Sequence, residues 1–498
     1  MLSSLRAALL PLALLATLSG CVSTGQYRAA PIDVPQQYAA GADHAGGARQ
    51  PLAMQATYPA QDIAADAWWQ GFGDPRLDRL VARALAVNAD LATAGLRLRQ
   101  ARLQAGLSET DLWPSASGSV SASGSRATDH HDDVARSHAA SVSLSWEIDL
   151  WGKLRAQRDA DRWEAEASDE DRENTALALV GEVCSQYWQL GYLNQSIAAG
   201  EEDLARLAKT LQLVRAQFQA GAVSRLEVRE AEQNLDSQRT AQSKLLQQRV
   251  EARTALTVLL DGRPWPQAEE PQNLDAIARP PLAPGLPAQL LARRPDLRAA
   301  ELRLRSALAD IKVTATSYYP TLSLNGSLDG SSPTLANVLK NPLATLGAGL
   351  TLPFLNLRQA QLNTRITGTS YEIAASTFRT TLYTALGDVD NALSARTQLQ
   401  VQVASAQRSF DAARDVERMY EVRYRSGASD LRTWLDAQQT RRSAELTLAQ
   451  ARLDQLDNDV TLYQALGGSG TSAAATGTAS APAASAVANA ATTAIAQD

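Results

Sequence analysis

Cys21 is the residue whose neighbours most clearly predict a chemical modification. It follows Leu18-Ser19-Gly20, and this pattern is typical of a bacterial lipobox, in which cleavage leaves the cysteine as a lipidated first residue. Arg6 and the largely apolar run 7–15 are typical of a secretory signal peptide over residues 1–20. The alternative is a buried cysteine near an ordinary cleavage site. The sequence therefore predicts a diacylglycerol and an N-acyl chain on Cys21, which begins a lipidated extended segment over 21–67.

Few other residues have the types and spacing that chemistry requires. Residues 130–133 (HHDD) and His138 have metal-ligating side chains, but a flexible polar loop between two strands is the favoured interpretation. Cys184 lies in a helical apolar pattern and is expected to be a buried free thiol. We find no nucleophile elbow, phosphate loop, zinc-hydrolase motif or dinucleotide fingerprint. The sequence predicts no enzyme, no metal site and no cofactor beyond the lipid on Cys21.

Composition argues against several classes of protein. The 498 residues carry 47 Lys and Arg against 53 Asp and Glu, a formal charge of −6, which is unlike a nucleic-acid binder. The 2 cysteines cannot form a disulfide scaffold. Beyond the signal peptide there is no apolar run of about eighteen residues, the length that a membrane-spanning helix requires.

An internal repeat organises the rest of the chain. Asp90-Leu91 recurs as Asp296-Leu297, and residues 218–222 recur as residues 424–428, both at an offset of 206. A constant offset over such a distance indicates two copies of one unit. We therefore expect repeat 1 over 68–262 and repeat 2 over 294–468. A Pro-rich linker is expected over 263–293, and the Ala/Ser/Thr tail 469–498 is expected to be disordered.

The sequence of each repeat predicts a helix, a hairpin of two strands, a long helix, a turn and a return helix, in that order. Asp74-Pro75 opens the first helix, which is expected to run to Trp113. The long helices have no proline and end before Gly221 and Gly427, because glycine is the usual residue after a helix. Apolar residues at 3-4-3-4 spacing, Leu204, Leu207, Leu211, Val214 and Phe218, predict a coiled-coil seam. The expected long and return helices are 152–220 and 223–260 in repeat 1, and 358–426 and 429–466 in repeat 2.

The strand hairpins, 115–149 and 321–355, carry the functional inference. Residues 141–149 alternate strictly between apolar and polar side chains, which is typical of a transmembrane β-barrel strand. Four strands per chain cannot close a barrel, and an open edge in lipid leaves backbone groups without partners. Closure therefore requires eight strands from two chains or twelve from three, and inward-facing serine and glycine favour the wider barrel. The alternative is a soluble β-layer beside a coiled coil.

Two stretches, 68–102 (WWQGFGDPRLDRLVARALAVNADLATAGLRLRQAR) and 290–324, closely resemble the outer-membrane factor family, the TolC/NodT-type lipoprotein exit ducts of tripartite efflux pumps. Residues 145–157 and 352–363 fit the same pattern. The resemblance implies a mixed α and β membrane protein. It would be a homotrimeric duct with a twelve-stranded barrel in the outer membrane and a long α-helical coiled-coil barrel in the periplasm. The linker would contribute to a belt around its equator.

The resemblance also implies where the partner binds. The turns between long and return helices would face the periplasm, close the duct at rest and meet the adaptor, a membrane fusion protein. Small residues allow another helical hairpin to approach the backbone closely. The adaptor-contact candidates are Gly221, Ala222, Val223, Gly427, Ala428 and Ser429.

By the same resemblance, Asp436 matches the acidic residue that narrows the closed periplasmic mouth. Carboxylates from three chains would form an anionic ring that attracts cations, and the alternative is a solvated helix face. Arg432 stands four residues earlier, where it could pair with Asp436 and weaken the ring's negative character. Glu230, the repeat mate of Asp436, is expected to contribute to the same gate.

The leading hypothesis is a passive outer-membrane channel that receives substrates from an adaptor and an inner-membrane pump. The pump would be of the resistance-nodulation-division (RND) or major-facilitator (MFS) type, and the sequence identifies neither it nor the cargo. A lipidated periplasmic adaptor is the first alternative, but adaptors carry a single hairpin with flanking β-domains. A trimeric coiled-coil surface protein is the second, and it would lack the strand hairpins.

Overall fold

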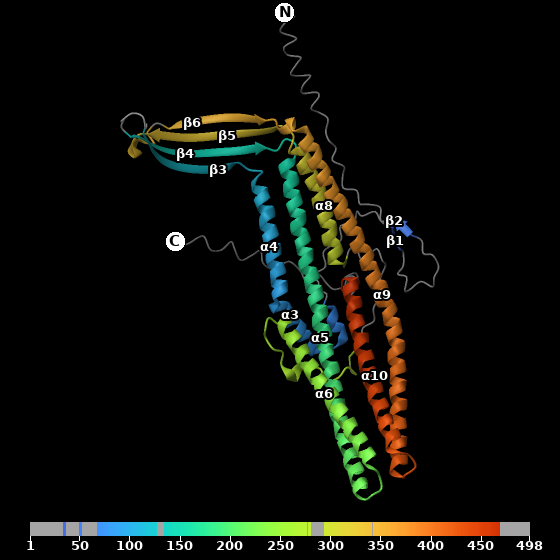
Figure 1. Cartoon of the computed structure of the whole chain (residues 1–498). Coiled ribbons are helices and arrows are strands. Elements are labelled where there is room, and N and C mark those ends of the chain that lie inside the picture. Colours follow the sequence, from blue (N-terminus) through green and yellow to red (C-terminus); the bar gives the residue numbers. More distant parts are fainter. Residues whose placement is uncertain are drawn as a thin grey trace, which may run out of the picture.

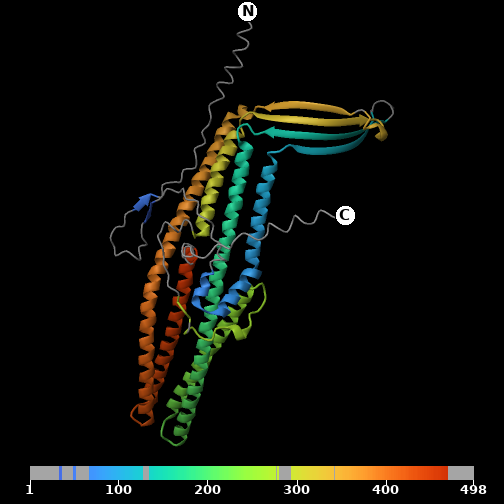
Figure 2. The same ribbon diagram turned by 180° about the vertical axis from the view of Figure 1, so that it is seen from behind.

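The computed structural model describes residues 67–126, 134–275, 277–279, 293–340 and 342–468, together with the short strands β1 (Asp33–Pro35) and β2 (Arg49–Pro51). The molecule is elongated, with a four-stranded sheet at one end and two helical hairpins at the other (Figures 1 and 2). Its signal peptide, the lipidation residue Cys21, loop residues 130–133 and the tail 469–498 lie outside the described residues.

The two repeats share one succession of helix, two strands, long helix and return helix, and repeat 1 has two further elements before it. Repeat 1 contains η2 (Trp68–Phe72), α3 (Pro75–Val87), α4 (Ala89–Thr110), β3 (Ser115–Ser125), β4 (Ala135–Ile148), α5 (Lys153–Gln219) and α6 (Arg225–Leu259). Repeat 2 contains α8 (Pro295–Thr316), β5 (Thr321–Ser332), β6 (Leu343–Thr351), α9 (Leu357–Arg425) and α10 (Leu431–Leu466).

The expectation of one unbroken helix from Asp74 to Trp113 is wrong. Asp74 caps the helix as expected, because its side chain accepts the Arg76 N–H at 2.9 Å. Asn88 then interrupts it with an extended backbone, caps α4 by accepting the Leu91 N–H at 3.0 Å, and α4 ends at Thr110. The Asn88 amide also donates to the Leu259 carbonyl at the end of α6 over 3.1 Å. The helix breaks there because α4 and α6 meet end to end, as Figure 1 shows.

The long helices end as expected. Gly221 and Gly427 have φ of +74° and +76°, a left-handed conformation that favours glycine. The Ala222 N–H donates to the Gln217 carbonyl, and the Ala428 N–H to the Arg423 carbonyl, each over 2.8 Å. These bonds satisfy carbonyls that a helix end otherwise leaves without partners. Each turn is therefore a short, tightly closed reversal of the chain.

The strands of the two repeats form one antiparallel sheet in the order β3-β4-β5-β6. Its register places serines opposite serines on one face, where the hydroxyls of Ser117 and Ser143 lie 2.8 Å apart. Val142 and Leu144 point to the other face and are 58% and 50% exposed. The predicted alternation is therefore confirmed, with a hydroxyl-rich face and an exposed apolar face.

The main hydrophobic core lies half-way along the molecule. Trp68 stacks on Tyr463 at 4.7 Å between ring centroids, and Phe72 meets Trp188 edge-on, also at 4.7 Å. Cys184 is fully buried in this cluster and free, as expected. Among the described helices, none is long and apolar enough to cross a membrane.

Candidate functional site

The two hairpin turns lie at the same end of the molecule (Figure 1). Gly221, Ala222, Gly427 and Ala428 are exposed there. The other two candidates for adaptor contact, Val223 and Ser429, are half-buried. The exposed backbone of both turns is therefore open to a partner that approaches along the axis of the molecule.

A small apolar cluster joins the two hairpins just above their turns. It contains Leu207, Leu211 and Val214 of α5 together with Leu431 and Trp434 of α10. These α5 residues belong to the predicted coiled-coil seam, so that part of the seam is confirmed. The seam does not reach the turn, because the Phe218 side chain is 44% exposed.

Tyr424 ties the second hairpin to the first. Its hydroxyl donates to Oε1 of Gln217 over 2.6 Å, and its ring stacks on Trp434 with centroids 5.2 Å apart. Burial raises the pKa of Tyr424, so the phenol remains a hydrogen-bond donor at neutral pH. Sequence analysis missed this link because Gln217 and Tyr424 belong to different repeats and no short motif contains both.

The predicted gate residues are placed on helices without contacting one another. Asp436 and Arg432 are exposed on α10, and Glu230 is half-buried on α6. No ion pair joins Arg432 to Asp436 within the described part of a single chain. Because successive helix residues turn by about 100°, Asp436 lies opposite the buried side of α10 that carries Trp434 and Gln438.

A buried cluster of charges connects three helices near the predicted gate residues of α10. Arg441 of α10 is 6% exposed and Asp203 of α5 is 4% exposed, and the two form an ion pair. Arg441 also lies 2.6 Å from Glu417 of α9 and 2.5 Å from Glu445 of α10. Because separating such a pair leaves charge buried without a partner, this cluster holds the second hairpin against α5.

A comparison of the two repeats at the offset of 206 would have pointed to this cluster from the sequence alone. The mate of Arg441 at an offset of 206 is Leu235, an apolar residue of the first hairpin. Burial raises the pKa of Glu417, while the attraction of Arg441 and Arg206 opposes that rise. A charged residue where the other repeat has a leucine marks the point where the two hairpins differ in chemistry.

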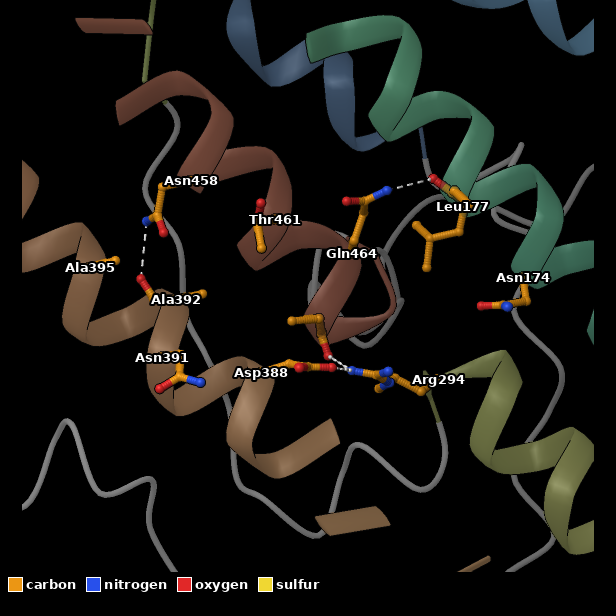
Figure 3. A pocket seen from close by; sticks show the side chains of 12 residues that line it. Asn174, Leu177, Arg294, Asp388, Asn391, Ala392, Ala395, Asn458, Thr461 and Gln464 are labelled. Atoms are coloured by element: carbon orange, nitrogen blue, oxygen red, sulfur yellow. Dashed lines mark hydrogen bonds and ion pairs between the residues drawn. The ribbon is translucent and has the colours of Figure 1, made fainter. Parts of the chain in front are cut away.

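A second polar region lies half-way up the helices, where α10 ends and α8 begins. A cavity of about 500 Å³ opens there between α5, α9 and α10. Figure 3 shows Arg294 at its edge, directed toward Asp388 of α9. The guanidinium donates to Asp388 over 3.2 Å and to the Ala465 carbonyl over 3.3 Å, and Asp296 accepts from it over 2.7 Å. This one side chain therefore connects the start of α8 with α9 and with the end of α10.

Among the described residues, no group of three or more His, Cys, Asp or Glu side chains is arranged to hold a metal ion. Residues 130–133, on which the weighed metal cluster depends, lie outside that part of the chain. His138 is described, at a position of β4 paired with Ala122 and Ser332.

Comparison with known proteins identifies the family. The family model described as outer membrane efflux protein matches residues 80–262 and 286–468, which correspond to the two repeats. The chain belongs to the outer membrane efflux protein family. It is accordingly an outer-membrane channel component of an efflux system, and the resemblance inferred from the sequence is confirmed.

Individual relatives agree with this assignment. The pyoverdine export outer membrane protein OpmQ of Pseudomonas aeruginosa is 32% identical over 415 residues, covering 80% of this chain and 87% of the relative. The probable outer membrane lipoprotein SilC of Salmonella typhimurium is 27% identical, covering 92% and 98%. The open-state structure of the MtrE outer membrane channel of Neisseria gonorrhoeae has a TM-score of 0.78 and 27% identity, covering 90% of this chain and 98% of that one.

Proposed function

We propose that three copies of the chain form one continuous exit duct. The observation that carries this proposal is the four-stranded sheet with one hydroxyl-rich and one apolar face. Its outer strands, β3 and β6, are each paired on one side only within the described chain. Three such sheets, joined edge to edge, give a twelve-stranded barrel whose apolar face meets lipid and whose serines line the lumen.

Exposed apolar residues on the helices support the same closure. Leu96 and Leu103 of α4 are 64% and 65% exposed, and Ile366 and Ile373 of α9 are both 62% exposed. Figure 1 places α4 and α9 on opposite flanks of the molecule. A ring of three chains brings the α4 flank of one copy against the α9 flank of the next, which removes these side chains from water.

The helical part then forms a periplasmic tube with its mouth at the hairpin turns. Asp436 of the three chains would face one another there and form the anionic constriction, with Arg432 and Glu230 beside it. Gly221, Ala222, Val223, Gly427, Ala428 and Ser429 would contact the adaptor. A groove of about 480 Å³, lined by Arg425 and Trp434 among others, extends this contact surface upward from the second turn.

The duct would work without catalysis or an energy source of its own. An inner-membrane pump of the RND or MFS type would supply the energy, and the adaptor would connect that pump to the turns. The lipid predicted on Cys21 would anchor the same end of the chain to the outer membrane. The relative SilC, named as a probable lipoprotein, supports that anchor.

Cross-linking of native outer membranes tests the assembly. We expect a lipidated trimer in the outer-membrane fraction. Ile373→Asp should abolish it, because the charge would be buried between copies, while Gln361→Asp on another side of α9 should leave it intact. A monomer in the inner membrane would refute the duct and favour the adaptor alternative.

Planar-bilayer recording tests the gate. Replacing both Arg432 and Asp436 with Ala should raise the conductance of the purified trimer and increase passive antibiotic leak in cells. Normal trimers with unchanged conductance would show that the constriction lies elsewhere.

A further inference from the structure

We propose that a groove in the apolar face of the sheet binds an acyl chain of the lipid predicted on Cys21, so that the anchor is seated against the barrel. This inference rests on the proposed duct, in which the apolar face meets lipid. The shape of the groove, its place in the sheet and the charges beside it support the proposal.

The groove lies where β4, β5 and β6 run side by side. Gly326 of β5 pairs with Leu144 of β4 and with Leu346 of β6, so the floor lacks a side chain and a leucine stands on either side of it. The volume of the groove is about 490 Å³. On the apolar face it is lined by Leu144, Trp146, Leu324, Gly326, Leu346 and Ala348.

Both the shape and the chemistry of the groove suit a hydrocarbon chain. A Cβ added to Gly326 would lie 3.3 Å from Cδ2 of Leu346 and 3.9 Å from Cβ of Leu144, so a larger residue would fill the floor. Asn325 also borders the groove, but its Oδ1 accepts from the Ser145 hydroxyl over 3.0 Å on the hydroxyl-rich face. The side chains that face the groove are therefore apolar, and a polar ligand would lose its hydrogen bonds to water there without replacement.

The groove lies at the end of the sheet that adjoins the helices (Figure 1). Pro114, which precedes β3, borders it, and Nε1 of Trp146 donates to the Leu112 carbonyl just beyond α4 over 3.1 Å. Trp151 and Tyr319 pack edge-on outside the strands, with ring centroids 5.3 Å apart. Aromatic residues are typical of the membrane–water interface of a barrel. In the proposed duct the groove therefore faces the periplasmic leaflet of the outer membrane.

The lipid on Cys21 can reach this groove. Ala67 packs against the main core, which contains Trp188, and α5 rises from there to Lys153 beside the sheet over about 50 Å. The roughly 46 residues from Cys21 to Ala67 can span up to about 150 Å when extended. Figure 1 shows the short strands β1 and β2 between the level of the core and the level of the sheet. The length of this segment is therefore ample for the anchor to enter the groove.

The charges beside the groove favour this anchor over a phospholipid. Glu109 and Asp111 are exposed at the end of α4, where their carboxylates repel a phosphate group. Lys153 is paired with Glu147 over 2.5 Å on the hydroxyl-rich side of the sheet. The diacylglycerol and N-acyl groups of the anchor carry no phosphate, and residues 21–27 have no charged side chain. The anchor therefore meets no repulsion at this end of the groove.

Photocrosslinking through the acyl chain tests the assignment on the native trimer. Cells grown with a diazirine-bearing palmitate incorporate it into phospholipids and lipoproteins, and irradiation joins each chain to the residues that it touches. Trypsin releases the anchor on peptide 21–28, because Arg28 is the first basic residue after the lipidated cysteine. Mass spectrometry should find this peptide joined several-fold more often to the groove than to Leu328, on the same face of β5 but farther from the helices. The expected sites are Leu144, Trp146, Leu324 and Leu346.

Two glycine substitutions on the same face provide the matched comparison. Gly326→Phe should lower the yield of groove adducts by roughly fivefold or more, because losing the apolar contact of a methylene or two shifts an equilibrium by about that factor. Gly118→Phe adds the same ring opposite Val142, away from the groove, where the nearest neighbour of an added Cβ would be the Ser141 carbonyl at 3.8 Å. It should leave the yield unchanged. If Gly326→Phe forms no trimer, the ratio of adducts at Leu324 and Leu328 in the parent decides the question.

The remaining outcomes separate the groove from the duct. Groove adducts that contain phospholipid in place of peptide 21–28 would overturn the assignment to the anchor, and so would equal yields at Leu324 and Leu328. A Cys21 without lipid would also overturn it, while a conducting trimer in the same membranes would leave the proposed duct intact. A chain that forms no conducting trimer would overturn the duct, and the groove assignment with it.

Discussion

The long helices α5 and α9 are repeat mates, yet they occupy different environments. Among the described residues, α5 buries 25 of its 67 residues and α9 only 8 of its 69. Helices of the same chain pack around α5, whereas one flank of α9 carries exposed residues such as Ile366 and Ile373. One sequence unit has thus been adapted to two environments: the α5 copy organises the chain, and the α9 copy leaves one flank exposed.

The sharpest test of this difference is a pair of substitutions at one repeat position. Trp188 of α5 is fully buried against Phe72, and its mate Ser394 of α9 is exposed. Trp188→Ala should reduce the free energy of unfolding by about 3–5 kcal/mol, because it opens a cavity in the core. Ser394→Ala should change it by less than about 0.5 kcal/mol. Thermal unfolding followed by circular dichroism measures both, and similar losses would contradict the difference in environment.

Ion pairs should stabilise the second hairpin at the position where an apolar residue stabilises the first. Arg441→Leu introduces the residue of its mate Leu235, but it removes the ion-pair partner of the buried Glu417 and leaves Asp203 paired with Arg206 alone. We expect a loss of about 3 kcal/mol and faster hydrogen exchange over the lower half of α10. Adding Asp203→Ala should recover part of that loss, since the two residues interact directly. Strictly additive effects would show that the cluster is not a unit.

The two repeats also differ in a buried carboxyl group, Asp457 of α10. Burial raises the pKa of Asp457 on α10 to about 6, against a hydrogen bond from Ser185 that lowers it. The folded chain therefore binds this proton more tightly than the unfolded chain, and the associated stability is lost as the pH rises through about 6.

The midpoint of thermal unfolding should consequently rise as the pH is lowered from about 7 to about 5. Asp457→Asn should flatten this dependence. Glu251→Gln, at the exposed mate position on α6, should not. An unchanged slope in Asp457→Asn would assign the pH dependence to other groups.

The smallest effect is expected at the joint of repeat 1. Asn88→Ala removes the cap of α4 and the hydrogen bond to Leu259, which should cost about 1–2 kcal/mol. Asn174→Ala, at an exposed position of α5, should be neutral in the same melting experiment. If Asn88→Ala is neutral as well, the end-to-end contact of α4 and α6 does not depend on this side chain.

Much of the architecture follows from local sequence signals. The alternation over 141–149 specifies a strand with two different faces, and Gly221 and Gly427 end long helices because few other residues adopt positive φ. These signals lie within a few residues of the feature that they specify. The offset of 206 then transfers each assignment from one repeat to the other. The family, the strand hairpins and the turns could therefore be predicted from the sequence alone.

Contacts between residues far apart in the sequence could be known only from the tertiary structure. The helix breaks at Asn88 because α6 ends beside it, 171 residues later in the chain. Tyr424 reaches Gln217, and Arg441 reaches Asp203, across a separation of more than 200 residues. Spacing along one helix suggested that Arg432 and Asp436 pair, but within the described chain their side chains form no ion pair. Periodicity reports which face of a helix is apolar, whereas the partner of a polar side chain depends on how whole helices pack.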